Sequence, residues 1–439
     1  MKKTVFEHAW ILTMDEDFTQ IRDGWLLAEG KNIAAMGEGD YAGECDERID
    51  CRGGILLPGF VNTHCHASMV PFRTMGDDCA DRLRRFLFPL EDQAMTRELT
   101  YLGALYGIAE MLLAGVTTFA DMYYFEDEVV RACRETGMRG YLGETIIGQS
   151  TCDAKGRPYG GFDIAQELLE AYRGDDLIRP ILAPHGTTTC DEAALIRCHE
   201  LAVKYDTLVT LHVSEMDYEM KHFADMGHTP LSYMEKIGMV SPHLLAAHCI
   251  HLTENDVEIL RRNSAGVAHC IASNTKAGKG VAPVKALLAA NVAVGLGTDG
   301  PSSGNTLNLF DQMRLFANFH KNENRDRSLF PAKDIVALAT RGGAKALHAE
   351  KEIGMLKPGM RADMVLVSIE GANMFPTYNP YSALVYCANV SNVEVVMTGG
   401  EIRVRGGRLM KSDMSDLRAK LEMQMKPFME SAAEYADII

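Results

Sequence analysis

The stretch LLAAHCIHLTENDVEILRRNSAGVAHC, residues 244–270, contains two short apolar runs separated by a helical segment. Each run, LLAAHC at 244–249 and AGVAHC at 265–270, has the length of a buried β-strand. A strand, a helix and a second strand in this order form the βαβ unit of a parallel sheet. The stretch therefore predicts an α/β fold.

The same alternation extends in both directions along the chain. Six further β-like runs lie between Pro58 and Gly300, and eight strands are the number that closes a (β/α)8 TIM barrel. The segments between the runs agree, since apolar residues recur at helical spacing from Thr96, a possible helix cap, to Gly115. The six runs are GFVNTHCH (59–66), VTTFADM (116–122), RGYLGETI (139–146), RPILAPH (179–185), LVTLHVSE (208–215) and VAVGLGTDG (292–300).

Both ends of the chain differ from this central part. Residues 1–57 and 363–408 contain short apolar or alternating runs interrupted by Gly and Asp, and neither segment alone holds enough strands for a stable sheet. We therefore expect one small β-sandwich domain built from both termini, residues 1–57 and 358–439, with the barrel, residues 58–357, inserted between them. A C-terminal helix is expected near residues 413–430.

The composition excludes several classes of protein. The 439 residues are 47% hydrophobic and 24% charged without low-complexity tracts, as in a folded globular chain. Acidic residues outnumber basic ones by 60 to 44 and no basic stripe is present, so a nucleic-acid partner is not expected. Because no signal-peptide core or membrane-spanning segment is found, we expect a cytoplasmic protein with no membrane partner. The eleven cysteines form no CxxC pair and are expected to be mostly buried thiols.

Five of the eight predicted strands end in residues that can bind a metal or transfer a proton. In a barrel these carboxyl ends meet at one face, where active sites form. Any one such histidine is more simply a hydrogen-bonded core residue, but their shared position favours a functional site. The residues are His64 and His66, His185, His212 with Glu215, His248, and Asp299.

The segment NTHCH, residues 62–66, allows a metal site, a nucleophilic thiol or simple burial. His64 and His66 alternate along a strand, so both side chains project to one face, about 6.5–7 Å apart and within reach of one ion. Cys65 points the other way, which disfavours the nucleophilic thiol. Imidazole nitrogens together with an aspartate oxygen suit Zn²⁺ or Fe²⁺ better than Ca²⁺ or Mg²⁺. We therefore expect zinc first, with iron open.

Several spaced motifs occur in order along the predicted strands: PGFVNTHCHASM, LHVSE, AAHCIHL, SNTKAGKGVAPV, GLGTDGPSSGN and IGMLKPGMRADMVLV. They resemble the amidohydrolase superfamily, in the branch of methylthioadenosine/S-adenosylhomocysteine deaminases and triazine chlorohydrolases. The resemblance extends over about residues 2–408. It implies a barrel with one divalent metal ion, because His185 stands at the end of the fourth strand, where members with two metals have a bridging lysine.

The resemblance also implies roles for individual residues. Glu215 would shuttle a proton, His248 would lie beside the attacking water, and Asp299 would take part in proton transfer as well as metal binding. Glu91, His185, Arg157 and Glu215 would contact the substrate. The implied metal ligands are His64, His66, His212 and Asp299.

The chain departs from the pattern of the nucleoside deaminases at two places near the expected substrate. Glu144 stands where these enzymes usually have an arginine. Cys270 and Ile271 stand in the segment that usually reads HNPxSNxK. Both departures concern the identity of the substrate and leave the expected metal chemistry intact.

The function expected from this resemblance is metal-dependent hydrolytic deamination of an adenine nucleoside, such as S-adenosylhomocysteine, methylthioadenosine or adenosine. One alternative is hydrolysis of another heterocycle, by deamination of guanine, a pterin or cytosine or by dechlorination of a triazine. A second alternative is a catalytically silent metal-binding scaffold. The expected partner is a small heterocyclic molecule, in a homo-oligomer of two or four chains.

Overall fold

The computed structural model describes residues 1–438 and divides the chain into two compact units. The division cuts through the barrel strands β6 (Phe60–Cys65) and β7 (Val116–Tyr123), and helix α15 (Met414–Ala432) belongs to the second unit. The domain bounds expected near residues 58 and 357 differ from this division and stay a prediction. The first unit comprises Met1–Asn62, Ala109–Phe119 and Asn308–Asp413, and the second comprises Thr63–Ile108, Ala120–Leu307 and the chain from Met414 onwards.

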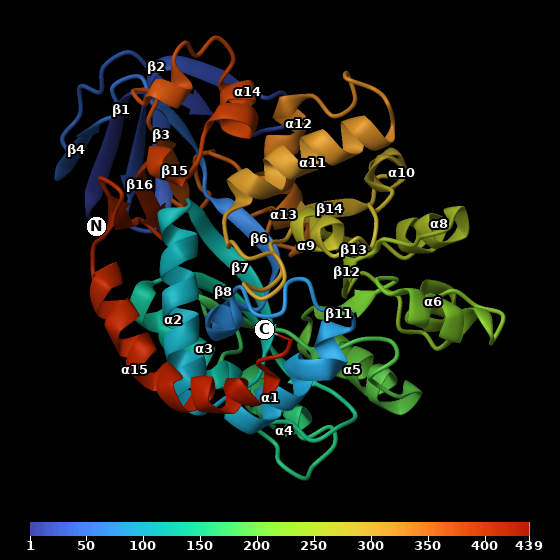
Figure 1. Ribbon diagram of the computed structural model, residues 1–439. Coiled ribbons are helices and arrows are strands. Elements are labelled where there is room, and N and C mark those ends of the chain that lie inside the picture. Colours follow the sequence, from blue (N-terminus) through green and yellow to red (C-terminus); the bar gives the residue numbers. More distant parts are fainter. Residues whose placement is uncertain (439) are drawn as a thin grey trace. The chain divides into compact units, whose positions relative to one another are not determined.

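A mixed nine-stranded sheet forms the framework of the first unit, with strands from the two ends of the chain side by side (Figure 1). Strand β5 pairs in parallel with β1 and antiparallel with β15, which sets Leu56 opposite Leu366. The β domain expected from both termini is therefore confirmed. The order is β18-β17-β16-β15-β5-β1-β2-β3, with β4 paired to β1. The bounds are β1 (Lys3–Leu12), β2 (Gln20–Glu29), β3 (Asn32–Glu38), β4 (Glu47–Asp50), β5 (Ile55–Pro58), β15 (Met364–Val367), β16 (Val393–Thr398), β17 (Glu401–Arg405) and β18 (Arg408–Leu409).

Apolar side chains from both ends of the chain form one core in this unit. Phe6, Ile11 and Leu26 from the N-terminal strands pack in the same buried cluster as Met364 and Val395. Neither terminal segment could bury this surface alone, because a sheet of few strands leaves one face in water. The helices of the unit are α11 (Leu309–Glu323), α12 (Ala332–Ala337), α13 (Gly343–Ala346) and α14 (Pro380–Ser382).

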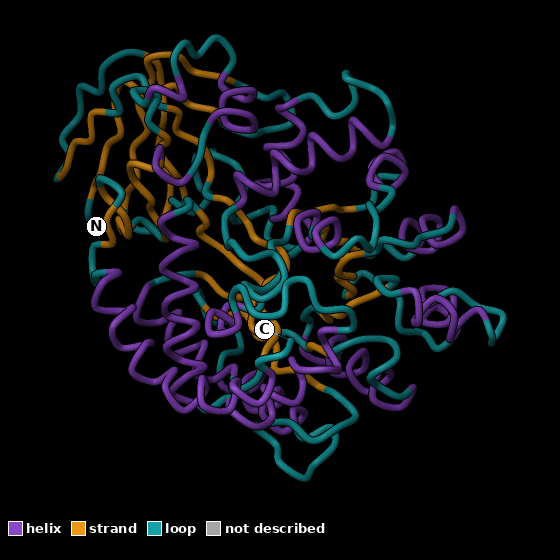
Figure 2. The backbone as a smooth tube through the Cα atoms, in the orientation of Figure 1, coloured by secondary structure: helices purple, strands orange, loops and turns teal. Residues whose placement is uncertain are grey.

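The TIM barrel expected from the sequence is confirmed, since each of the eight predicted runs contains strand residues. The strands form two parallel sheets, β6-β7-β8-β10 and β11-β12-β13-β14, and strands alternate with helices along the chain. Figure 2 draws the strands in orange and the helices in purple. A parallel bridge between Leu182 and Val209 joins the sheets. After β14, Thr298 N and Asp299 N donate to the carbonyl of His64 at 3.1 and 3.0 Å. The remaining barrel strands are β8 (Arg139–Ile146), β9 (Ile178–Pro180), β10 (Ala183–Pro184), β11 (Val209–Val213), β12 (Leu244–His248), β13 (Gly266–His269) and β14 (Ala293–Leu296).

Capping side chains define where the barrel helices begin. Thr96 accepts a hydrogen bond from Leu99 N at 3.2 Å before α2, as the sequence predicts. Before α8, Thr253 Oγ1 accepts from Asp256 N and the Asp256 carboxylate accepts from Thr253 N, a capping box. The helices are α1 (Phe88–Ala94), α2 (Arg97–Leu113), α3 (Glu126–Thr136), α4 (Gly161–Ala171), α5 (Glu192–Tyr205), α6 (Asp217–Ala224), α7 (Pro230–Lys236), α8 (Glu254–Arg262), α9 (Ile271–Lys276) and α10 (Val284–Ala289).

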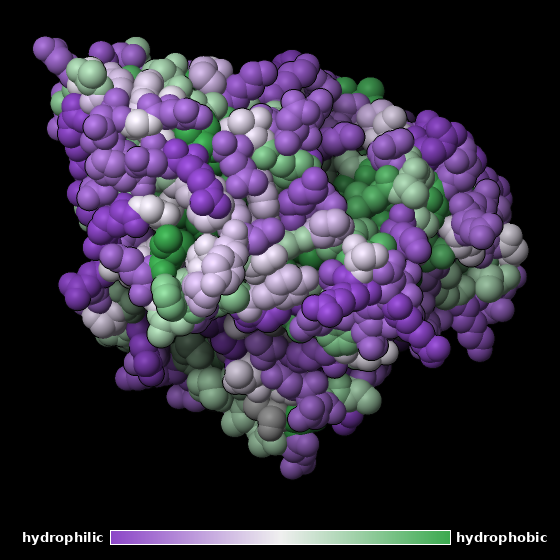
Figure 3. Space-filling model, turned by 90° about the horizontal axis from the view of Figure 1, so that it is seen from above, coloured by the Kyte–Doolittle hydropathy of each residue, from purple (hydrophilic) through white to green (hydrophobic). Residues whose placement is uncertain are grey.

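The surface agrees with the acidic, polar composition of the chain. On the face drawn in Figure 3, hydrophilic residues predominate and hydrophobic ones form small separate areas. Among residues 1–438, no helix has the length and apolar character that crossing a membrane requires. All eleven cysteines are free thiols, as expected.

The capping box at α8 predicts a measurable contribution to stability. Thr253→Ala removes the hydroxyl that accepts the Asp256 amide and should lower the free energy of unfolding by about 1 kcal/mol. Urea unfolding followed by circular dichroism measures the change. Thr253→Ser keeps the hydroxyl and should retain most of the stability, so equal stability of the Ala variant and the wild type would contradict the capping role.

Candidate active site

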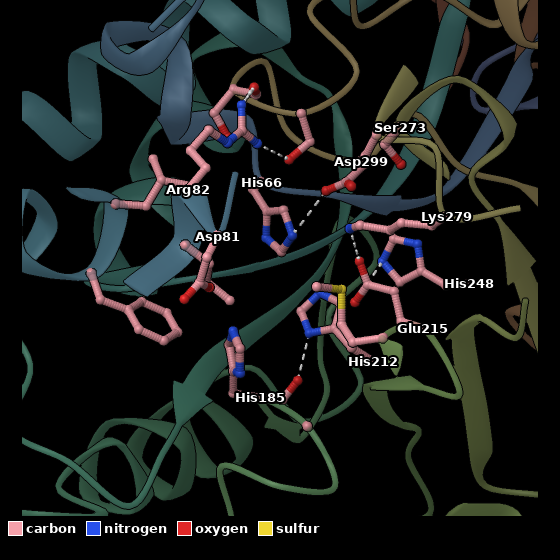
Figure 4. Close-up of a pocket in the computed structure, with 18 of the residues that line it drawn as sticks. His66, Asp81, Arg82, His185, His212, Glu215, His248, Ser273, Lys279 and Asp299 are labelled. Atoms are coloured by element: carbon pink, nitrogen blue, oxygen red, sulfur yellow. Dashed lines mark hydrogen bonds and ion pairs between the residues drawn. The ribbon is translucent and has the colours of Figure 1, made fainter. Parts of the chain in front are cut away.

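Most of the predicted site residues lie at the ends of the barrel strands and line one cavity in the second unit (Figure 4). The cavity has a volume of about 780 Å³, within the range of about 300–1,000 Å³ that is common for small-molecule sites. His64 lies on β6 and is only 1% exposed. The predicted residues that line the cavity are His66, Glu91, His185, His212, Glu215, His248 and Asp299.

Three histidines form a cluster that can hold one metal ion. One nitrogen from each of His64, His66 and His212 lies within 4.8 Å of the other two. The Nδ1 atom of His66 is 2.5 Å from the Met122 carbonyl, and that of His212 is 2.5 Å from the His185 carbonyl. Because a carbonyl can only accept, each Nδ1 must carry the hydrogen. Nε2 is therefore the atom through which each neutral ring would bind a metal ion.

The buried Nε2 atom of His64 indicates that a metal ion fits this cluster. His64 Nε2 has no hydrogen-bond partner among the described residues, although unpaired buried polar atoms are rare in proteins. Burial, followed by the neighbouring His66 and His212, keeps the pKa of His64 well below its usual value. The ring is thus neutral, the form that binds a metal, and a metal ion would supply the partner that Nε2 lacks.

Asp299 adds a carboxylate to the three imidazoles. Its Oδ1 lies 3.2 Å from His66 Nε2. Burial opposes a proton on His66, but the hydrogen bond and charge of Asp299 outweigh burial and raise the pKa of His66 to about 9. The same contact holds the pKa of Asp299 well below its usual value against the effect of burial. The site therefore attracts positive charge, and three nitrogens with one oxygen suit a borderline divalent metal ion.

Glu215 lies between two basic side chains at the edge of this cluster. Lys279 Nζ donates to its Oε1 at 2.5 Å, and its Oε2 lies 3.8 Å from His248 Nε2. Burial would raise the pKa of Glu215, but its interactions with His248, Lys279 and His212 outweigh burial and lower it to about 2. Glu215 is therefore a carboxylate in the free protein at neutral pH.

Glu219 holds the backbone of Glu215 and was not found by sequence reasoning. Its carboxylate accepts from Ser214 N at 2.9 Å, from Glu215 N at 2.8 Å and from the Thr187 hydroxyl at 2.5 Å. The signal for it was present, because Glu219 is the third residue of α6, where a glutamate commonly caps the helix. Lys279 and Arg82 also line the cavity and were likewise not assigned a role.

Backbone conformations at the strand ends also aim these side chains. His248 and Asp299 have φ angles of 70° and 59°, and Ser214, just before Glu215, has 52°. Residues other than glycine rarely adopt this left-handed region, and such strain is concentrated at functional sites. At Gly297 a Cβ atom would lie 3.1 Å from His64 N and 2.9 Å from Cys270 Sγ. Only glycine therefore fits where the last barrel strand passes the first.

The three residues expected to contact only the substrate lie in different environments. Glu91 lines the cavity and accepts a hydrogen bond from the Tyr123 hydroxyl at 2.9 Å, while burial raises its pKa to about 7. His185 also lines the cavity, and burial and then His66 lower its pKa to about 4. Arg157 is exposed, pairs with Asp163 at 2.7 Å and is not among the lining residues. A role for Arg157 in substrate binding stays a prediction.

The two departures from the family pattern lie outside the cavity lining. The Glu144 carboxylate accepts from Phe125 N at 3.2 Å and Glu126 N at 2.8 Å, so it caps helix α3. Cys270 and Ile271 are fully buried, and neither they nor Glu144 lines the cavity. The sequence suggested that these positions face the substrate, but strand alternation turns Glu144 outward, while its neighbour Thr145 lines the cavity.

The fold and the site together define a class of protein: a (β/α)8 barrel whose strand ends gather side chains that can hold a divalent metal ion. A sequence profile of the amidohydrolase family matches residues 55–403. The chain therefore belongs to the amidohydrolase family, as its motifs predict.

Relatives of known name cover almost the whole chain. The 5-methylthioadenosine/S-adenosylhomocysteine deaminase 1 of Syntrophus aciditrophicus is 38% identical over 406 residues, 91% of each chain. The 5′-deoxyadenosine deaminase of Methanosarcina mazei is 35% identical over 418 residues, 94% of this chain and 95% of that one. Among solved structures, an adenosine deaminase from Xanthomonas campestris with bound zinc has a TM-score of 0.93 and 28% identity, covering 98% of this chain and 99% of that one.

The geometry predicts that His64 is required for metal binding. His64→Ala removes one of three clustered nitrogens and should reduce bound metal from about one ion per chain to a small fraction, since loss of a single ligand weakens such centres strongly. Elemental analysis of protein dialysed against trace zinc measures the content. His199→Ala, outside the cavity lining, is the control. Full metal content in the His64 variant would contradict the assignment.

Proposed function

We propose that this protein is a metal-dependent hydrolytic deaminase of an adenine nucleoside such as methylthioadenosine, S-adenosylhomocysteine or 5′-deoxyadenosine. The names of its relatives support this substrate class. The observation that carries the proposal is the position of Glu215, which lines the same cavity as His248, Asp299 and two of the clustered histidines. A structural metal site would need neither an acid nor an open cavity beside it.

His64, His66, His212 and Asp299 would hold the metal ion, with zinc as the proposed metal and iron open. When bound, such an ion lowers the pKa of a coordinated water from about 15.7 to about 7, and so supplies hydroxide at neutral pH. Zinc is supported by the donor set of three imidazoles and one carboxylate. The bound zinc of the Xanthomonas campestris adenosine deaminase agrees with this choice.

Two carboxylates, Glu215 and Asp299, would accept and transfer the two protons of the attacking water. Glu215 starts as a carboxylate, so it first accepts one proton and then gives it to the ring nitrogen next to the attacked carbon. Asp299 takes the second proton and passes it to the amino group, which leaves as ammonia. One water is consumed, one ammonia is released, and the amino-bearing carbon becomes an oxo group beside a ring N–H.

His248 would orient the attacking water. Its Nδ1 lies 2.8 Å from Asn274 Oδ1, which fixes the ring and turns Nε2 toward Glu215. From there Nε2 can hydrogen-bond to the oxygen that attacks the ring and stabilise the charge that develops on it.

The proposed contacts to the substrate follow from the rest of the lining. Glu91, held by Tyr123, can accept hydrogen bonds from the two ribose hydroxyls. His185, which packs edge-on against Phe88 with ring centroids 5.4 Å apart, can contact the base or the ribose. The cytoplasmic location and the homo-oligomeric state expected from the sequence stay predictions.

Ammonia release tests the proposed function directly. Zinc-loaded protein should release ammonia from at least one of adenosine, methylthioadenosine, S-adenosylhomocysteine and 5′-deoxyadenosine. His64→Ala and Glu215→Gln should lower kcat/KM by about 100-fold or more, because they remove metal binding and proton transfer respectively. Thr253→Ala, outside the cavity lining, is the control.

The same assay separates the alternative functions. If no nucleoside releases ammonia but guanine, a pterin or cytosine does, the proposed substrate would change from an adenine nucleoside to that base. Chloride release from a triazine without ammonia would replace deamination by dechlorination. Silence of the metal-loaded protein with every compound would favour a catalytically silent scaffold.

Glu91 predicts a pH dependence of nucleoside binding. Its pKa of about 7 means that it is protonated below pH 7 and a carboxylate above it. Since the carboxylate is the better acceptor for hydroxyl groups, KM for a ribonucleoside should fall as the pH rises from 6 to 8. Steady-state kinetics of the wild type and Glu91→Gln measure this. A Gln variant with the same pH dependence as the wild type would rule out Glu91 as its source.

A further inference from the structure

Lys279 brings an ammonium group into the catalytic cavity. It lies in the segment after α9, lines the cavity, and its side chain is 24% exposed. Figure 4 shows it reaching toward Glu215 beside His248. Its Nζ donates to Glu215 Oε1 at 2.5 Å, a short charge-assisted hydrogen bond. This contact is made to the residue proposed to move the proton.

The two oxygens of Glu215 have different surroundings as a result. Oε1 is occupied by Lys279, whereas Oε2 faces His248 Nε2 at 3.8 Å. Glu219 fixes the backbone amide of Glu215 at 2.8 Å. The carboxylate is therefore held at its backbone and at one oxygen, and the other oxygen is directed toward the proposed position of the attacking water.

A second lysine close by in the sequence shows that this contact is specific to Lys279. Lys276, the last residue of α9, also lines the cavity but turns to Asp77 at 2.7 Å and to Asn305. The two lysines are three residues apart and carry the same charge but contact different carboxylates. Lys276 is therefore a matched control for Lys279.

We propose that Lys279 is a positioning residue for proton transfer: it anchors Glu215 Oε1 so that Oε2 alone carries the proton from water to the ring nitrogen. This inference rests on the proposed deamination. Lys279 keeps its own protons throughout. Oε2 gains one proton from water as the carbon–oxygen bond forms and loses it to the ring nitrogen, so the ion pair is the same before and after the step.

The charge of Lys279 also acts on Glu215, together with groups on the surrounding elements. His212 on β11 and His248 on β12 face the carboxylate, and His185, Tyr218, Glu219 and Cys270 also interact with it electrostatically. Without the ammonium group, only the two histidines would lower the pKa of Glu215, against the opposite effect of burial. The pKa of Glu215 should then rise, and with it the lower limit of the pH range in which Glu215 can accept a proton.

Kinetics of three variants of the zinc-loaded protein test the proposal. Lys279→Met keeps the length of the side chain without its charge and should lower kcat by about 10- to 100-fold, within the usual contribution of a positioned acid–base group. KM should change by less than about threefold, because Lys279 acts on Glu215 and not on the substrate. The acid limb of the kcat/KM profile should move to higher pH. Lys279→Arg should recover much of kcat, and Lys276→Met should leave the acid limb at the wild-type pH.

A measurement without turnover separates this inference from the proposed function. Carbon-13 NMR of glutamate carboxyls, with Glu215→Gln to assign the signal, should show Glu215 titrating at higher pH in Lys279→Met than in the wild type and in Lys276→Met. Wild-type protein that releases no ammonia, together with this shift, would overturn the proposed deamination while supporting the Lys279–Glu215 coupling. An unchanged titration and acid limb in Lys279→Met, or the same shift of both in Lys276→Met, would overturn the inference.

Discussion

The hydrogen bonds from Thr298 N and Asp299 N to the His64 carbonyl are the constraint on which the site depends. They tie the end of the last barrel strand to the first strand. This closure brings Asp299 within 3.2 Å of His66, which precedes it by more than two hundred residues in the sequence. Gly297 makes the close passage possible, because a Cβ atom there would lie 2.9 Å from Cys270 Sγ and 3.1 Å from His64 N. Without this closure the clustered imidazoles would lack their carboxylate.

The centre formed in this way concentrates groups that are unfavourable alone. His64 Nε2 is buried without a partner, and burial disfavours the charges of Asp299 and Glu215. Basic side chains offset this cost, His66 beside Asp299 and His248 and Lys279 beside Glu215. As a result, the clustered histidines and Asp299 favour binding of a cation, and Glu215 is an ionised carboxylate that can accept a proton. Glu219 then holds Glu215 in position and Asn274 holds His248.

Much of the fold follows from local patterns. The eight apolar runs form strands because each is short and apolar and is followed by a helix, and side-chain caps at Thr96 and Thr253 mark the start of two of these helices. The terminal strands were also predictable, since neither end of the chain could bury its apolar face without the other. The grouping of α15 with the second unit was not predictable, because an amphipathic helix shows that it packs but not against which partner.

The sequence by itself determined which strand ends carry histidine, aspartate and glutamate, and a barrel must bring those ends to one face. It also determined the family, through motifs in fixed order. Tertiary structure alone decided the pairings across that face: Lys279 with Glu215, His66 with Asp299, and Glu144 with the start of α3 instead of the cavity. These pairings depend on side-chain directions and on strained residues such as His248 and Asp299, whose φ angles of 70° and 59° no local pattern specifies. The physical reason is that such conformations are imposed by the packing of distant segments, whereas strand and helix periodicity is set by neighbouring residues.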